Sequence, residues 1–158
     1  MFIRPATRRD FDLIPPLIEA AFGQHDEALI VERLRDDGDI VFEFVATDRD
    51  VLIGHIVMSK LVSPKHCLAL APLSVHPDYQ KRGIGSTLVR KATEVAEERG
   101  WTAAFVLGNP AYYGRFGYEV AEAQEFDTVY PSEFMAACVF DAAGFGAASR
   151  DLVYPAAF

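Results

Sequence analysis

The spacing of apolar residues predicts a helical first part of the chain. Six apolar positions recur at intervals of three and four, which places them on one face of a helix that ends at Gly23. They are Leu13, Ile14, Leu17, Ile18, Ala21 and Phe22. A second helix is predicted over 27–35, and a short strand, 2–4, precedes both helices.

Apolar runs predict strands through the middle of the chain. The runs 41–47 and 51–60 flank the polar sequence Asp48-Arg49-Asp50, an arrangement typical of a β-hairpin. A third apolar run, 67–75, ends at His76-Pro77. We therefore expect a strand-rich segment after the first two helices.

A long amphipathic helix follows the third apolar run. Its apolar face carries Ile84, Leu88, Ala92, Val95 and Ala96. Gly100 ends this helix, and 102–107 is a strand in the position of a βαβ crossover partner. Further strands are predicted near 117–122, near 135–141 and over 149–153.

The length and composition of the chain fit one globular domain. It has 158 residues, of which 51% are hydrophobic and 24% charged, and no linker or shift in composition divides it. We expect a single domain over 1–158. The order of its elements predicts an α/β (α+β) architecture, in which a mixed sheet carries helices on both faces.

The charge of the chain disfavours two classes of partner. The formal net charge is −8, which disfavours nucleic acid and anionic membranes as partners and favours a cationic or amine substrate. The absence of a membrane-length apolar run and of an apolar leader predicts a cytoplasmic protein. Cys67 and Cys138 lie in apolar runs, so we expect two buried thiols and no metal site.

A glycine turn between a predicted strand and a predicted helix carries the clearest chemical signal. Gly83 and Gly85 remove side chains where a ligand must approach backbone N–H groups. The first turn of the helix supplies free N–H donors and a positive dipole end, so it predicts a phosphate or pyrophosphate site. Lys81 and Arg82 add positive charge that the acidic chain lacks elsewhere.

Two other phosphate-binding motifs do not fit this turn. A P-loop requires Lys before its Ser/Thr, whereas Ser86-Thr87 follows Gly85 without a lysine. A dinucleotide-binding turn requires a small residue at the position of Leu88, and it is shorter than this one. A helix cap that binds no ligand remains as the structural alternative.

The sequence of this turn resembles a known family motif. Gln80-Lys81-Arg82-Gly83-Ile84-Gly85 resembles the Gln/Arg-x-x-Gly-x-Gly/Ala signature of the GNAT superfamily of N-acetyltransferases. Downstream, 109–118 resembles the Asn…Ala…Tyr-x-x-x-Gly-Phe segment of that family, and 4–7 resembles its opening strand. The match covers about 2–120 in the correct order, and with the ending 153–155 it is most similar to the YhbS-like subgroup.

The resemblance implies an acetyltransferase fold and reaction. It implies a mostly antiparallel sheet whose fourth and fifth strands are splayed by a bulge, with which Pro72 is consistent. It also implies acetyl-CoA as the acyl donor and a primary amine of a small molecule or peptide as the acceptor. A homodimer is left open.

The resemblance also assigns roles to individual residues. It implies that the backbone of Leu73, Ser74 and Val75 pairs with the pantetheine arm of the donor. It implies that the pyrophosphate is held by Gln80, Lys81, Arg82, Gly83, Ile84, Gly85 and Ser86. By the same resemblance, Asn109 bonds the pantetheine, and Tyr113 lies near the thioester sulfur and acts as the acid.

The general base is not evident from the sequence. Many members of the family have a glutamate on the fourth strand, whereas 66–75 contains no carboxylate. His25 and Asp26 are candidates because their loop is expected to face the acceptor; the simpler interpretation of all four histidines is surface or structural. The alternatives to an enzyme are an acyl-CoA-binding or sensing domain without catalysis and a partner-binding domain with an inactive cleft.

Overall fold

The computed structural model describes residues 1–147 and 149–158. The strands are hydrogen-bonded in the order β1-β2-β3-β4-β5-β6, and the chain divides into two compact units. The first unit comprises 1–58, 72–92 and residue 157; the second comprises 59–71, 93–156 and residue 158. The strands are β1 (Phe2–Pro5), β2 (Ile40–Asp48), β3 (Val51–Lys60), β4 (Cys67–Val75), β5 (Ala103–Leu107) and β6 (Met135–Val139).

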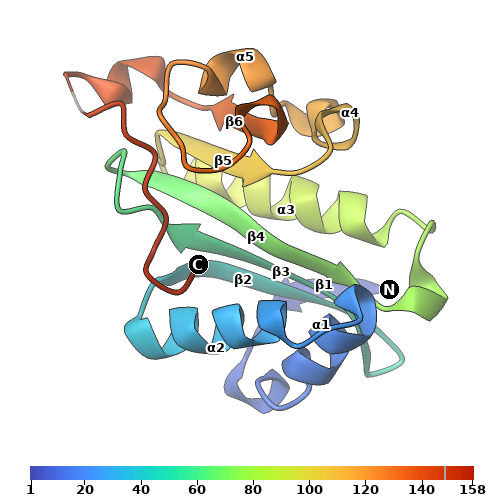
Figure 1. Ribbon diagram of the computed structural model, residues 1–158. Coiled ribbons are helices and arrows are strands. Elements are labelled where there is room, and N and C mark those ends of the chain that lie inside the picture. The colour runs from blue at the N-terminus through green and yellow to red at the C-terminus, as the bar shows by residue number, and fades with distance from the viewer. Residues whose placement is uncertain (148) are drawn as a thin grey trace. The chain divides into compact units, whose positions relative to one another are not determined.

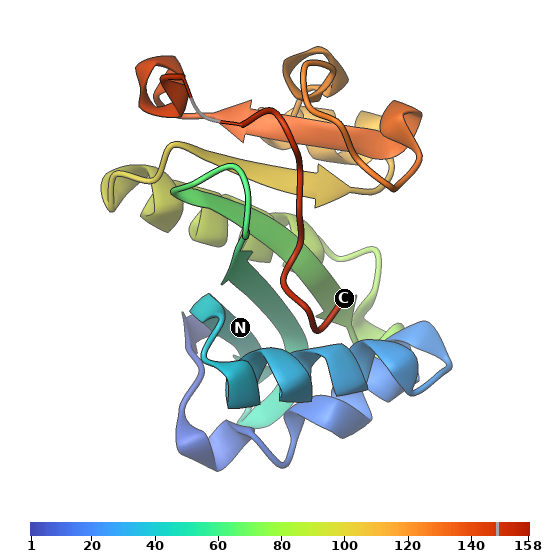
Figure 2. The same cartoon turned by 60° about the vertical axis from the view of Figure 1, so that its left-hand side comes forward.

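Both helices predicted for the first part of the chain are present in the structure. The α-helices are α1 (Ile14–Phe22), α2 (Asp26–Asp37), α3 (Ile84–Glu98), α4 (Pro110–Tyr113) and α5 (Val120–Ala123). Gly23 ends α1 in the left-handed conformation that glycine adopts without strain. In both views α1 and α2 lie side by side (Figure 1 and Figure 2). Among the described residues, no helix has the length and apolar character needed to cross a membrane.

Helices cover both faces of the sheet in the first unit. Successive residues of a strand point to opposite faces, so Gly54 and His55 of β3 distinguish the two. A Cβ atom on Gly54 would lie only 2.9–3.0 Å from side chains of α3, so α3 packs directly on that face. The His55 side chain, on the other face, contacts Glu43, which pairs with Arg35 of α2. This arrangement confirms the predicted mixed sheet with helices on both faces.

Strand β4 has one more residue than the strand that it pairs with. His76 N–H donates to the carbonyl of Ile53 at 2.9 Å, and Leu61 N–H donates to the carbonyl of Cys67 at 3.0 Å. Ile53 and Leu61 are eight residues apart, whereas Cys67 and His76 are nine apart. The extra residue makes a β-bulge in β4, in the segment that contains Pro72, which has no N–H to donate.

Strand β5 pairs with a neighbour on each side. It runs parallel to β4 from Cys67↔Ala103 to Ala69↔Phe105. It runs antiparallel to β6 over its full length, from Ala103 to Leu107, and the two strands lie side by side in Figure 1. The connection from β4 through α3 to β5 is therefore the predicted parallel crossover.

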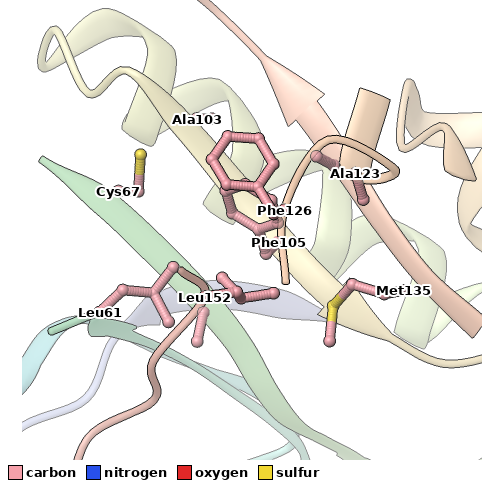
Figure 3. Packing of buried hydrophobic residues seen from close by; sticks show 10 residues of the cluster. Leu61, Cys67, Ala103, Phe105, Ala123, Phe126, Met135 and Leu152 are labelled. Atoms are coloured by element: carbon pink, nitrogen blue, oxygen red, sulfur yellow. The ribbon is translucent and has the colours of Figure 1, made fainter. Parts of the chain in front are cut away.

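A cluster of buried side chains forms the core of the second unit (Figure 3). Phe105 and Phe126 lie edge to face, with ring centroids 5.1 Å apart. Cys67 belongs to this cluster as a free thiol, and burial raises its pKa to about 12. Cys138 is also free but only half-buried, so the prediction of a buried thiol is confirmed for Cys67 alone.

The segment 117–122 is not the strand that its pattern predicted. Glu119 exchanges two backbone hydrogen bonds with Ala137 of β6, at 2.9 and 3.0 Å, and forms an isolated bridge there. Helix α5 begins at the next residue, because the sequence Val-Ala-Glu-Ala contains good helix formers. The strand predicted over 135–141 is confirmed but ends at Val139.

The segment 149–153 is also not a strand. Asp151 and Val153 form isolated bridges, to Asp127 and Ser63 respectively. Leu152 between them is buried in the cluster of the second unit. The buried side chain of Leu152 and the isolated bridges of its two neighbours hold this segment in place, without a continuous ladder of hydrogen bonds between strands.

Candidate active site

The turn between β4 and α3 is closed by side chains of its own residues. The side-chain amide of Gln80 donates to the carbonyl of Val75, the last residue of β4, at 3.0 Å. His76 Nδ1 accepts from the N–H of Asp78 at 3.1 Å, as a helix cap does. Gln80, predicted to hold a pyrophosphate, is therefore brought together with Val75 and ties the turn to the strand.

The glycine of the turn lies where a ligand can approach. Gly83 has a φ of +82°, and a Cβ atom there would meet nothing within 4 Å. Its carbonyl accepts from both the N–H of Thr87, at 3.1 Å, and the hydroxyl of Thr87, at 2.8 Å. The helix ladder thus begins at Gly83, and the amides of Ile84 and Gly85 have no acceptor within the helix.

Positive charge gathers at the same turn. Lys81 and Arg82 are both exposed, and Lys81 has a φ of +63°, which is uncommon for a side chain of its kind. The Arg82 guanidinium carbon lies 5.2 Å from the centroid of the Tyr79 ring, a cation–π distance. The turn combines free amides, a helix N-terminus and two cations, which is the chemistry of an anion site.

Asn109 and Tyr113 are brought together by one turn in the second unit. The amide oxygen of Asn109 accepts from the N–H of Ala111 at 3.0 Å and caps α4. The backbone carbonyl of Asn109 accepts from the N–H of Tyr113 at 3.1 Å. The NH₂ group of Asn109 takes no part in this cap and can donate.

Tyr113 is positioned by close packing. A Cβ atom on Gly108 would lie 2.6 Å from Cε2 of Tyr113, so the ring rests against the backbone of Gly108. Burial, with a smaller contribution from Tyr112, raises the pKa of Tyr113 to about 12. The phenol is therefore protonated at neutral pH and able to donate a hydrogen bond.

A neighbouring tyrosine has a different role. Tyr118 is 1% exposed, and its hydroxyl pairs with Oγ1 of Thr93 at 2.8 Å. Burial raises the pKa of Tyr118 further than that of Tyr113. The aromatic segment thus contains both a core residue, Tyr118, and the residue predicted to act as the acid, Tyr113.

The two candidate bases lie next to each other in the first unit. His25 Nδ1 contacts the carboxylate of Glu19, and the His25 side chain is 59% exposed. Asp26 is the first residue of α2. Of the other histidines, His66 stacks on Trp101 with centroids 4.5 Å apart, which is a structural role.

Sequence reasoning missed a buried charged cluster. Glu43 accepts two hydrogen bonds from the Arg35 guanidinium, at 2.7 and 2.8 Å, and one from His55 Nε2, at 2.8 Å. Burial acts to raise the pKa of Glu43, but these bonds and charges outweigh it and lower the pKa to about 2. The available signal was a carboxylate, Glu43, within one apolar strand and an imidazole, His55, within the next.

A cavity of about 320 Å³ lies in the first unit. It is lined by Leu13, Pro16, Leu17, Ala20, Asp50, Val51, Leu52 and His76. Apolar walls with one carboxylate and one imidazole suit an organic cation better than an anion.

The mixed sheet and the glycine turn before α3 agree with the class of acyl-transferring enzymes that the sequence resembles. The Acetyltransferase (GNAT) family matches residues 6–118. An uncharacterized N-acetyltransferase of Escherichia coli K12, YhbS, is 33% identical over 83% of this chain and 81% of its own length. This chain therefore belongs to the GNAT family of acetyltransferases.

Two solved structures support the same conclusion. The crystal structure of YhbS from Escherichia coli in complex with CoA is 28% identical, with a TM-score of 0.90 over 99% of this chain and 91% of that one. A GNAT family acetyltransferase from Brucella melitensis in complex with acetyl-CoA is 27% identical, with a TM-score of 0.81 over 99% and 97%. The predicted fold, with its mixed sheet, is confirmed.

Proposed function

We propose that this chain transfers the acetyl group of acetyl-CoA to a primary amine of a small molecule or peptide. Membership of the family supports the reaction, and two similar proteins with CoA or acetyl-CoA bound support the donor. The observation that carries the proposal for this chain is the open, cationic glycine turn at the start of α3.

The residues of the turn would bind the pyrophosphate of the donor. The N–H groups of Gly83, Ile84, Gly85 and Ser86 donate to its oxygens, and Lys81 and Arg82 balance its charge. Gln80 acts by holding the turn closed against Val75. The backbone of Leu73, Ser74 and Val75 would pair with the pantetheine arm, and the NH₂ group of Asn109 would donate to it.

Tyr113 would supply the proton that the leaving group requires. The amine nitrogen attacks the thioester carbonyl, and the carbon–sulfur bond then breaks with its electron pair on sulfur. The phenol of Tyr113 donates its proton to this thiolate. The phenol is protonated at neutral pH, as this role requires, while the raised pKa makes it a weaker acid than an exposed tyrosine.

The proposed location of the enzyme is the cytoplasm. Cys67 and Cys138 are both free thiols, as is usual for proteins of a reducing compartment. The net charge of −8 is consistent with an amine acceptor and unfavourable for nucleic acid.

The variant Gly83→Asp tests the proposal. It places a negative charge and a side chain where the pyrophosphate would bind, so the affinity for acetyl-CoA should fall at least tenfold, about 1.4 kcal/mol. Gly100→Asp is the matched control, because Gly100 has a φ of +81° and equally open surroundings at the other end of α3. Calorimetric titration with acetyl-CoA measures both variants.

The outcomes separate the alternatives. Equal affinities in Gly83→Asp and Gly100→Asp would contradict the proposed donor site. Binding of acetyl-CoA without CoA release, across a panel of primary amines, would instead identify a binding or sensing domain.

A further inference from the structure

The cavity of the first unit is built by one helix face, one hairpin and the residue that follows β4. Four of its lining residues have the spacing i, i+3, i+4 and i+7, which places them on one face of the first helical segment. Its volume of about 320 Å³ lies within the range of small-molecule sites, about 300–1,000 Å³. The helix-face residues are Leu13, Pro16, Leu17 and Ala20, and the others are Asp50, Val51, Leu52 and His76.

The rim of this cavity is apolar and exposed. Leu13 is 53% exposed and Val51 is 56% exposed, whereas Leu17 is only 3% exposed. The apolar lining therefore extends from solvent into the body of the first unit. Exposed apolar side chains that gather at one cavity are typical of a surface that contacts a ligand. An alkyl or aryl group fits such a lining.

Asp50 adds a negative charge to the apolar lining. Arg49 and Asp50 form the turn between β2 and β3 with φ values of +50° and +67°, as a two-residue hairpin turn requires. This tight turn fixes the backbone of Asp50 at the cavity. Arg4 lies within range of its charge, but the Arg4 guanidinium is bound to Asp10 at 2.7 and 2.9 Å. The charge of Asp50 therefore favours a cationic ligand.

His76 connects the cavity to the turn that precedes α3. Its ring lines the cavity, and its Nδ1 accepts from the N–H of Asp78 at 3.1 Å. The same ring meets the Tyr79 ring edge to face, with centroids 6.0 Å apart. The Arg82 guanidinium carbon lies 5.2 Å from the Tyr79 centroid. Continuous contacts thus run from the cavity lining to a cation of the proposed donor site.

The cavity lies at the phosphate end of the proposed donor site. In the proposed function, the pantetheine arm pairs with 73–75 and the pyrophosphate with 80–86. The thioester then lies at the far end of the arm, on the side of Leu73 away from the turn. His76 follows Val75 on the side of the phosphates. A molecule in the cavity is therefore placed to affect the binding of the donor rather than to receive its acetyl group.

We propose that this cavity binds an apolar organic ammonium ion as an effector, and that the bound effector strengthens the binding of acetyl-CoA through His76. The second part rests on the proposed function. The ammonium group pairs with Asp50, and the apolar group fills the space against α1. A ligand in contact with the His76 ring restricts that ring, and so holds in place the cap and the Tyr79 contact that order the turn. A turn that is already ordered costs less to fix when the donor binds.

The hexyltrimethylammonium ion is a suitable probe. Its nitrogen has no lone pair, so it cannot accept an acetyl group, and any effect it has is separate from turnover. Titration followed by carbon-13 methyl NMR should show saturable shifts of Leu13, Leu17 and Leu52, with a Kd of about 1 mM or tighter. Hexanoate, which has a similar chain and the opposite charge, should produce no saturable shift. The absence of shifts with the probe, or equal shifts with hexanoate, would overturn the site.

Two variants test the charge and the space of the cavity. Asp50→Asn should weaken binding of the probe about threefold or more, whereas Asp48→Asn makes the same change of charge in the same hairpin outside the lining and should not. Ala20→Leu fills the cavity from an exposed helix position, keeps a good helix former and should abolish binding. Unchanged binding in both Asp50→Asn and Ala20→Leu would place the probe elsewhere and overturn the proposal.

The coupling is measured by calorimetric titration of acetyl-CoA with and without saturating probe. The probe should tighten acetyl-CoA binding about fivefold or more, and acetyl-CoA should tighten probe binding by the same factor. His76→Asn keeps an oxygen that can cap the N–H of Asp78 but removes the ring, so the factor should fall close to one. No coupling in the wild type, or full coupling in His76→Asn, would overturn the role of His76.

Failure of the effector site and failure of the proposed function give different results. A protein that binds acetyl-CoA but not the probe would contradict the effector site alone. A protein that binds the probe in an Asp50-dependent manner but does not bind acetyl-CoA would support the site and contradict the proposed function.

Discussion

At the scale of single residues, the difference between Tyr112 and Tyr113 is open to measurement. Tyr113→Phe removes only the hydroxyl that the reaction is proposed to use, so kcat should fall by about 10²–10⁴ while acetyl-CoA affinity changes little. Tyr112→Phe is the control, since the two rings pack edge to face at 5.0 Å and share their surroundings. Single-turnover kinetics on both variants would show whether the chemical step itself has changed; equal rates would exclude Tyr113 as the acid.

Sequence patterns could indicate individual residues but not the contacts that position them. Tyr113 was predicted from motif spacing, which is a local property of the chain. Its contact with Gly108 was not, because that contact depends on the path of the turn. The cluster of Glu43 and His55 was missed for a related reason: their pairing follows from strand register and from the position of α2, not from neighbouring letters.

At the scale of elements, the packing of α3 on the sheet depends on a missing side chain. Gly54→Val would place atoms within 3 Å of the present positions of Leu88 and Ile84, and Ala46 lies only 3.2 Å from the new Cβ. We expect the free energy of unfolding to fall by about 1–3 kcal/mol, the usual range for overpacking. Chemical denaturation measures this loss.

A second glycine provides the control for that prediction. Gly114 has a helical backbone with a φ of −56° and open space where a Cβ would be added. Gly114→Ala should be neutral or slightly stabilising, because it reduces the freedom of the unfolded chain. A loss of stability equal to that of Gly54→Val would show that close packing is not the cause.

Long elements with strong periodicity were predicted well, whereas two short segments late in the chain were not. The helices α1 to α3 and the strands β2 to β4 have enough residues for a period of 3.6 or 2 to stand out. In 117–122 and 149–153, apolar residues are too few to separate a strand from an anchored loop. There the outcome depended on single contacts of Glu119 and Leu152 with distant parts of the chain.

At the scale of the whole molecule, two buried carboxylates make stability depend on pH. Asp10 accepts two hydrogen bonds from Arg4, at 2.7 and 2.9 Å, and one from the N–H of Thr7 at 2.7 Å. The hydrogen bonds from Arg4 lower the pKa of Asp10 from 3.8 to about 2 against the opposing effect of burial. Glu43 has its pKa lowered from 4.5 to about 2.

The sign of the effect follows from these values. A carboxyl group whose pKa is lower in the folded state stabilises the fold above its unfolded pKa and loses this contribution as the pH falls through its folded pKa. At about 1.4 kcal/mol for each pH unit between the two values, Asp10 contributes roughly 2.5 kcal/mol and Glu43 roughly 3.5 kcal/mol at neutral pH. The free energy of unfolding should therefore decrease between about pH 5 and pH 2.

The variant Asp10→Asn tests this dependence. It should be less stable than the wild type at pH 7, and the gap should narrow at pH 3, where the wild-type carboxylate begins to lose its advantage. Asp12→Asn, at an exposed position two residues away, should show no such change. Urea unfolding at the two pH values gives the comparison, and a gap that stays constant would refute the assignment.

The extra residue in β4 restricts which insertions and deletions the chain tolerates. Before the bulge, odd-numbered Cys67 and Ala69 pack in the cluster with Leu61. After it, even-numbered Ser74 opposes His55, two residues in from the His76–Ile53 hydrogen bond. Side chains alternate between the two faces of a strand, so the bulge changes which residues of β4 share a face with Leu61 and His55: odd-numbered ones before it and even-numbered ones after it. Deleting one residue between Cys67 and Leu73 would give β4 the same spacing as β3, so both halves could pair in one unbroken register without the bulge, whereas an insertion there would leave two residues unmatched.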